Sequence, residues 1–236
     1  MIDPSKWNRL FANQPAFILG TGPSIEDIDL SMLNGFYTIG VNRIFLKYDP
    51  TCIFWQDISL WNDHARKLDN LECIKIPAYC SKTHTSLPDH EGQYYVKSRT
   101  VYVKHSTSTS ACVSDDYLTF IRSKNVSASG IMAVQLAIML GCSPIVLVGI
   151  DGDYSGNKTN FYGVCEHHDK KTLSIYRKSM LWLQKVYTLP IINCGKSLMW
   201  PHRNFYSIVG TLDRNKKKAD YHKNKLCGLN NAFTGN

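Results

Sequence analysis

The feature that most constrains the fold of this chain is a series of short, continuous apolar runs. Segments in which apolar residues recur at helical spacing lie between some of these runs. Seven such runs predict buried strands, at 16–20, 36–41, 52–56, 74–76, 100–103, 144–149 and 190–193. Apolar residues recur at three- and four-residue steps over 129–140 and 170–187, which predicts two helices. Strands that are apolar throughout are typical of parallel sheets covered on both faces. The sequence therefore predicts an α/β fold, with a Rossmann-like, mostly parallel sheet and helices on both faces.

The length and composition fit a single domain of this kind. The chain has 236 residues, of which 44% are hydrophobic and 19% charged, and this excludes a disordered or fibrous protein. We assign residues 1–202 to the α/β domain, with the polar stretch 78–125 as an insertion or lid, and 203–236 to a basic C-terminal segment. No apolar run reaches the roughly 20 residues of a membrane-spanning helix, and the N-terminus lacks a signal-peptide pattern. We therefore expect a cytoplasmic protein.

Charge and cysteine content further limit the classes of function that are compatible with this sequence. The net charge is +8, and residues 203–225 hold seven basic residues against two acidic ones. Such a segment attracts polyanions, including nucleic acid, or is simply a solvated tail. The eight cysteines are scattered, and no two form a Cys-x-x-Cys pair. We expect them to be reduced structural thiols rather than zinc ligands.

The first predicted strand ends in a Gly-x-Gly turn. Gly20 and Gly22 let the backbone approach a ligand closely, and Ser24 with Asp27 has the spacing of a capping box at a helix start. Because a helix N-terminus attracts anions, the turn predicts a nucleotide phosphate site, and a purely structural turn is the alternative. The turn has neither the third glycine of the dinucleotide fingerprint nor the Gly-Lys-Thr of a P-loop.

Further polar residues follow the neighbouring strands. Asn42 follows the second strand, and Gln56 and Asp57 follow the third. They converge on one crevice if these strands are adjacent, or they merely cap the next helices. Ser129 and Gly130 lie at a helix start that suits an anion or a ribose. Together these groups make 1–202 a predicted nucleotide-binding domain.

Two later segments carry ionisable groups. In the loop after Gly149, Asp151 and Asp153 form an Asp-x-Asp pair that could hold Mg²⁺ or Mn²⁺ between phosphates, hydrogen-bond a ribose or anchor the loop. His167 and His168 precede the helix predicted over 170–187. Adjacent histidines point in different directions, so at most one of them is expected to act as a general base.

Four of these motifs occur in the order found in a known family. The segments Phe-Ile-Leu-Gly-Thr-Gly-Pro-Ser at 17–24, Gly-Val-Asn-Arg at 40–43, Ser-Gly at 129–130 and Gly-Ile-Asp at 149–151 resemble those of bacterial lipooligosaccharide sialyltransferases. They also resemble the related 6-hydroxymethylpterin diphosphokinase-like proteins, which include the motility accessory factors. The resemblance implies contacts to a cytidine monophosphate sugar from Gly20, Thr21, Gly22, Asn42, Ser129, Gly130, Gly149 and Asp151. Thr21 stands where the family's turn usually has Asn, so an amide that could contact the nucleotide is missing.

The resemblance also implies catalytic roles. In the family a His before a helix, followed by Lys and Thr, deprotonates the acceptor hydroxyl. The stretch His168-Asp-Lys-Lys-Thr172 matches that context and selects His168 over His167. Tyrosines of the family's loop help the departing phosphate, which makes Tyr154 and Tyr162 candidates here.

We therefore favour a glycosyltransferase that moves a sugar from a nucleotide-activated donor, with a CMP-sugar favoured, to the hydroxyl of a glycan or another acceptor. No cofactor or metal is favoured for this reaction. The first alternative is an ATP-dependent diphosphokinase, in which Asp57, Asp151 or Asp153 would hold Mg²⁺ or Mn²⁺. A nucleic-acid-binding or nucleic-acid-modifying protein that uses the basic C-terminal segment is the second, and a scaffold without turnover is the third.

Overall fold

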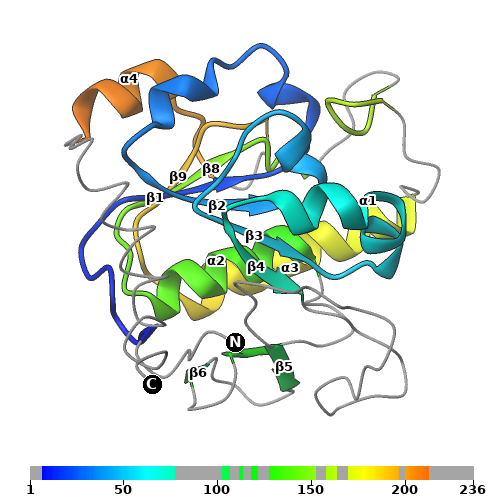
Figure 1. The fold of residues 1–236 in the computed structure, drawn as a ribbon. Helices are drawn as coiled ribbons and strands as arrows, with labels where there is room; N and C mark the ends of the chain where they lie inside the picture. The colour runs from blue at the N-terminus through cyan, green and yellow to red at the C-terminus, as the bar shows by residue number, and fades with distance from the viewer. Residues whose placement is uncertain are drawn as a thin grey trace, which may run out of the picture.

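The computed structural model describes residues 7–77, 103–106, 112–113, 118–121, 128–152, 158–163, 170–196 and 200–212. Within these ranges a six-stranded sheet has the order β4-β3-β2-β1-β8-β9, and every neighbouring pair whose register is given is parallel. Its strands are β1 (Ala16–Leu19), β2 (Tyr37–Val41), β3 (Cys52–Trp55), β4 (Ile74–Pro77), β8 (Ile145–Val148) and β9 (Ile191–Asn193). The predicted α/β, Rossmann-like sheet is therefore confirmed (Figure 1).

Helices cover both faces of this sheet. The α-helices are α1 (Ile58–Asn70), α2 (Ser129–Met139), α3 (Lys170–Val186) and α4 (Phe205–Thr211). Three short 3₁₀ helices, η2 (Pro23–Ile25), η3 (Leu30–Leu33) and η4 (Asn42–Leu46), lie in the connections after β1 and β2. Figure 1 shows α2 and α3 together on one face, with α4 and the early connections on the other.

Alternate residues of each strand supply the two cores. In β1, Ala16 and Ile18 pack with α2 and α3, whereas Phe17 and Leu19 pack with η2, η3 and α4. Ile53 and Trp55 of β3 pack with α1 in a third cluster. Because both faces are covered, the strands are apolar at most positions, with Thr38, Lys75 and Asn193 as buried exceptions. This explains why the sequence shows mainly continuous apolar runs rather than alternation.

The predicted insertion contains strands of its own. β5 (Val103–Ser106), β6 (Cys112–Val113) and β7 (Leu118–Ile121) form a second sheet of order β5-β7-β6. β5 pairs with β7 in parallel, and β6 pairs with β7 antiparallel. The described parts of the stretch 78–125 thus form a small sheet, and its role as a lid stays a prediction.

Two local features differ from the predictions. The polar segment 58–70 forms α1, a helix that the sequence implied only through the alternative that Asp57 caps a helix. Residues 213–236 of the basic segment lie outside the described ranges. The capping box proposed for Ser24 and Asp27 is wrong, because only the 3₁₀ helix η2 follows the turn and its N-cap is Gly22. The start of the basic segment forms α4, which buries Phe205 and Val209 in the core.

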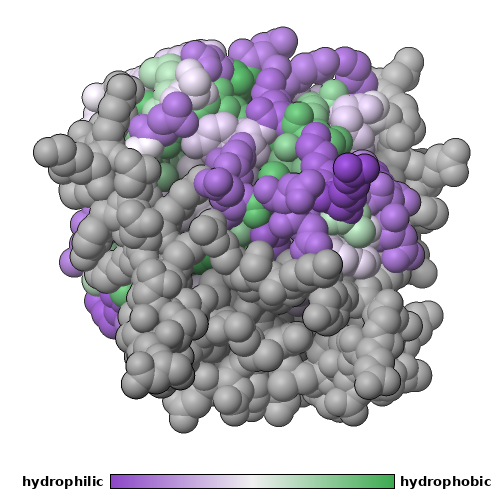
Figure 2. All heavy atoms as spheres, viewed as in Figure 1, coloured by the Kyte–Doolittle hydropathy of each residue, from purple (hydrophilic) through white to green (hydrophobic). Residues whose placement is uncertain are grey.

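One face of the molecule is mainly polar where the structure describes it. Figure 2 shows hydrophilic residues over most of the described part of one face, with smaller apolar areas between them. Among the described residues, none of the helices is long and apolar enough to span a bilayer.

Candidate functional site

The order in which the chain adds strands to the sheet reverses between β1 and β8. From β1 the chain adds β2, β3 and β4 on one side, whereas β8 and β9 lie on the other side of β1. In open α/β sheets this reversal opens a crevice at the carboxyl ends of the strands, where ligands bind. The turn after β1, with Gly20 and Gly22, and the loop after β8, with Gly149 and Asp151, both lie at this point.

The two loops pack tightly against each other. The Gly20 amide donates to the carbonyl of Val148 (2.8 Å), and the Gly22 amide donates to that of Gly149 (2.8 Å). A Cβ on Gly20 would lie 2.6 Å from Ile150 Cδ1, and a Cβ on Gly22 would lie 2.8 Å from the Gly149 oxygen. Both positions therefore require glycine for packing, and both amides are used inside the protein rather than offered to a phosphate.

Asp151 anchors the turn after β1. Its carboxylate accepts hydrogen bonds from the amide (2.9 Å) and the hydroxyl of Ser24 and from the amide of Lys196 (3.0 Å). The residue is only 5% exposed. Among the described residues no group of three His, Cys, Asp or Glu side chains is arranged to hold a metal ion, and Asp153 lies outside these residues. Of the roles predicted for Asp151, the contacts thus match loop anchoring.

Asn42 has the strained geometry that often accompanies a binding role. It follows β2 with a φ of +52°, in the left-handed region that costs free energy for any residue but glycine. Its amide oxygen is buried and has no hydrogen-bond partner within the described part of the chain. The side chain caps nothing, because η4 begins at Asn42 itself and its N-cap is Val41.

Gln56 and Ser129 connect the sheet edge with a helix start. Gln56, 7% exposed, donates from its amide nitrogen to the Ser129 hydroxyl (2.8 Å). Ser129 is the first residue of α2, whose N-terminus lies at the carboxyl edge because α2 runs back toward the start of β8. Asp57 occupies the N-cap position of α1, yet its exposed side chain makes no capping hydrogen bond. The alternative that Asn42 and Asp57 merely cap helices is therefore not what the structure shows.

Tyr176 of α3 also reaches this helix start. Its hydroxyl lies 2.8 Å from the position that a Cβ on Gly130 would take. The helical spacing of the sequence indicated only that Tyr176 belongs to the apolar stripe of its helix. Because the approach joins α2 to α3, no local sequence signal could have identified it.

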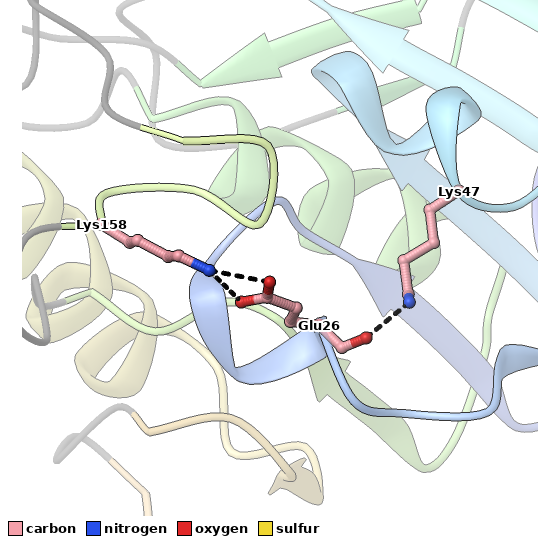
Figure 3. Close-up of polar contacts among 3 residues, drawn as sticks. All are labelled: Glu26, Lys47 and Lys158. Atoms are coloured by element: carbon pink, nitrogen blue, oxygen red, sulfur yellow. Dashed lines mark hydrogen bonds and ion pairs between the residues drawn. The ribbon is translucent and has the colours of Figure 1, made fainter.

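A short segment that we call the strap (158–163) lies over the glycine turn. The Thr21 hydroxyl donates to the side-chain oxygen of buried Asn160 (2.8 Å), and the Phe161 amide donates to the Thr21 carbonyl (2.9 Å). Figure 3 shows Lys158 of the strap paired with the Glu26 carboxylate (2.8 Å). Thr21 thus contributes its side chain to the fold, so its hydroxyl proton is already used.

Arg43, a cationic residue, directly follows Asn42 in the chain. Arg43 donates to the carboxylate of Asp63 on α1 (2.8 Å), and its guanidinium carbon lies 5.5 Å from the centre of the Tyr162 ring on the strap. Burial lowers the pKa of nearby His64, and the positive charge of Arg43 lowers it further. The sequence predicted no role for Arg43, which stood out only as part of the Gly-Val-Asn-Arg motif at 40–43. Its position directly after Asn42 was the available signal.

Three predicted residues lie outside the described ranges: His168, Tyr154 and Asp153. The predicted residues that are described fall into two sets by their place in the fold, and within the second set a hydrogen bond joins Gln56 to Ser129. One links the loops after β1 and β8 (Gly20, Thr21, Gly22, Ser24, Gly149 and Asp151), and the other follows β2 and β3 and begins α2 (Asn42, Gln56, Asp57, Ser129 and Gly130). Tyr162 joins the strap to Arg43.

Comparison with solved structures finds proteins of similar fold at low sequence identity. A motility accessory factor (MAf) glycosyltransferase from Magnetospirillum magneticum AMB-1 is similar in structure, with a TM-score of 0.55 and 14% identity. The alignment covers 97% of this chain, which therefore spans only 41% of that protein. The sialyltransferase CstII from Campylobacter jejuni, solved with cytidine-5′-monophosphate, aligns over 80% of this chain and 83% of its own, with a TM-score of 0.49 and 17% identity. No family model matches the sequence, and no curated protein matches it.

Proposed function

We propose that this protein is a glycosyltransferase that moves a sugar from a nucleotide-activated donor, with a CMP-sugar favoured, to an acceptor hydroxyl. The observation that carries the proposal is Asn42, a residue in a strained conformation whose buried amide oxygen lacks a partner within the described chain. It follows β2 at the carboxyl edge of the parallel sheet, and Gln56, which is hydrogen-bonded to Ser129, follows the neighbouring strand β3. A donor group of a nucleotide or its sugar would satisfy that oxygen.

The polar groups suit a nucleotide bound across the carboxyl ends of β2 and β3. Asn42, Gln56 and Ser129 offer amide and hydroxyl groups, and the first turn of α2 adds the positive end of a helix dipole. The glycine turn contributes shape more than hydrogen bonds, because the Gly20 and Gly22 amides are already paired. Nucleotide selectivity is therefore expected to depend mainly on Asn42 and Gln56.

The transfer itself needs a base and a stabilised leaving group. In the proposal His168 takes the proton of the acceptor hydroxyl while the acceptor oxygen bonds to the anomeric carbon. The bond from that carbon to the phosphate oxygen breaks, and its electron pair stays on the phosphate. Tyr162, and Tyr154 in the same role, would donate hydrogen bonds to that oxygen. The roles of these three residues come from the sequence resemblance.

The test is calorimetric titration with CMP, UDP, GDP and ATP, each with Mg²⁺ and with EDTA. We expect the wild-type protein to bind CMP preferentially and equally well in EDTA. The variant Asn42→Gly keeps the positive φ without strain and removes the amide. We expect it to bind CMP about tenfold more weakly, the loss of one good hydrogen bond, with no loss of stability.

Asn13→Gly is the matched control. Asn13 also has a positive φ (62°), but it lies at the opposite edge of the sheet, where its backbone amide donates to the Gly141 carbonyl. Its binding should equal that of the wild type. ATP binding only with Mg²⁺ would favour the diphosphokinase instead. The proposal fails if the wild type binds none of the nucleotides, or if Asn42→Gly and Asn13→Gly bind equally well.

A further inference from the structure

Two separate segments, α1 and the strap, converge on the side chain of Arg43. Arg43 comes directly after Asn42 at the end of β2. Asp63 of α1 accepts a hydrogen bond from its Nη2 at 2.8 Å, and the Tyr162 ring of the strap lies 5.5 Å from its Cζ. The aromatic ring and the carboxylate together restrict the position of the guanidinium.

The guanidinium retains hydrogen-bonding capacity in this position. A guanidinium has five N–H donors, and the pair with Asp63 uses an N–H on Nη2. The side chain is 26% exposed, so part of it faces solvent, whereas Asp63 is 51% exposed. An exposed ion pair of this kind contributes little to stability. The position of Arg43 between a carboxylate and an aromatic ring is therefore poorly explained by its contribution to stability.

Two lysines near the glycine turn already have partners. Lys158 pairs with the carboxylate of Glu26 (2.8 Å), and Lys47 donates to the backbone carbonyl of Glu26 (2.7 Å), as Figure 3 shows. Both therefore brace the connection after β1. Arg43, in contrast, directly follows Asn42 at the strand end where the donor is proposed to bind, and its Nε is buried without a hydrogen-bond partner within the described part of the chain.

We propose that Arg43 binds an anionic oxygen group of the donor, a role that rests on the proposed function. Asp63 and Tyr162 hold its planar fork, a geometry that suits phosphate and carboxylate oxygens. The group is either the phosphate of the nucleotide or a carboxylate on the transferred sugar. If it is the phosphate, Arg43 stabilises the negative charge that grows as the bond to the anomeric carbon breaks and its electron pair moves to the phosphate oxygen.

The experiment compares three ligands by titration calorimetry: cytidine, CMP and the donor analogue CMP-3FNeuAc, which carries a sugar carboxylate. The variants are Arg43→Gln, which removes the charge, and Arg43→Lys, which keeps the charge but loses the fork. Arg66→Gln is the matched control, because Arg66 is an exposed arginine of α1 and its replacement makes the same change in net charge. Thermal unfolding of each variant shows whether it is folded.

A phosphate contact predicts that Arg43→Gln weakens CMP binding by about 10- to 100-fold, the loss of a charge-assisted hydrogen bond, while cytidine binding is unchanged. A carboxylate contact predicts unchanged CMP binding and a similar loss for CMP-3FNeuAc alone. Arg43→Lys should recover part of either loss. In both cases Arg66→Gln should behave as the wild type does.

Two results would overturn the inference, and they are distinguishable. If the wild type binds CMP or CMP-3FNeuAc and Arg43→Gln binds each as tightly as Arg66→Gln does, Arg43 is only half of a surface ion pair, and the proposed function stands. If the wild-type protein binds neither CMP nor CMP-3FNeuAc, the proposed donor site is wrong and the role of Arg43 falls with it.

Discussion

The carboxylate of Asp151 accepts three hydrogen bonds, two from Ser24 and one from the Lys196 amide. These contacts tie the loop after β8 to the turn after β1 and to the chain after β9. A residue engaged in this way has little capacity left for a metal ion or a ribose. We therefore regard Asp151 as a positioning residue that shapes the crevice.

Replacing Asp151 by Asn should destabilise the whole domain. The amide nitrogen of Asn would face an amide donor, so at least one of the three hydrogen bonds is lost inside a buried site. Hydrogen bonds to charged groups contribute about 1.5–3 kcal/mol, and we expect a loss of that order in the free energy of unfolding measured in urea. Asp27→Asn, an exposed change in the same connection, should cost less than about 0.5 kcal/mol. Equal stability of the two variants would contradict the anchoring role.

Individual residues show what the sequence could and could not predict about the site. Asn42, Gln56 and Ser129 were identified as site candidates from their positions after strands and at a helix start. The strain at Asn42 was not predictable, because its positive φ depends on how the chain leaves β2. Likewise, Thr21 and Asn160 are 139 positions apart, and their hydrogen bond exists only once both loops have met.

The strap (158–163) is the element that covers the glycine turn and carries Tyr162. Two kinds of contact hold it there. One is buried: the Thr21 hydroxyl donates to Asn160, which is 1% exposed. The other is on the surface: Lys158 and Glu26 form an ion pair whose side chains are 52% and 42% exposed. The buried contact should contribute more to holding the strap in place. Leaving a buried polar group without a partner costs about 1–3 kcal/mol of stability, whereas an exposed ion pair contributes about 0–1 kcal/mol.

We therefore expect Thr21→Val to loosen the strap and Lys158→Gln to leave it nearly unchanged. Valine keeps the shape of threonine but leaves the Asn160 oxygen buried without this donor. The measurement is hydrogen exchange of the strap amides, with that of Phe161, bonded to the Thr21 carbonyl, as the most informative. Exchange should accelerate about 10-fold or more in Thr21→Val. The opposite ranking of the two variants would show that the surface ion pair holds the strap.

Helices and strands could be predicted where most of their buried positions carry apolar residues. β1, β2, β3 and β8 lie within one residue of the predicted runs at each end, because buried parallel strands are apolar throughout. α1 was not evident from its apolar pattern, because Leu60 and Leu68 are the large side chains that it buries, so its helical stripe is sparse. The predicted run at 100–103 overlaps β5 (Val103–Ser106) at Val103, and residues 100–102 lie outside the described ranges.

At the scale of the whole molecule, the sequence predicted the sheet type but not the strand order. Alternating strands and helices imply parallel pairing, and the expected position of the site at the carboxyl ends follows from that alone. The insertion of β1 between β2 and β8 depends on long-range pairing, which one sequence does not reveal. That order matters for function, since it puts the glycine turn and the Asp151 loop side by side.

The layered core also makes a prediction about pH. Burial raises the pKa of Cys194 to about 11 and that of Cys52 to about 12, from an ordinary 9.0, and raises that of Tyr48 from 10.0 to about 12. The native protein therefore keeps these protons at a pH where the unfolded chain has lost them. Their contribution to stability is complete below about pH 9 and disappears as the pH rises through the native values, with a slope of up to about 1.4 kcal/mol per pH unit for each group. Urea unfolding from about pH 8 to about pH 11 should show this decline, and it should be shallower in Cys194→Ala. A free energy of unfolding that stays constant over this interval would mean that these groups ionise in the native protein as easily as in the unfolded chain.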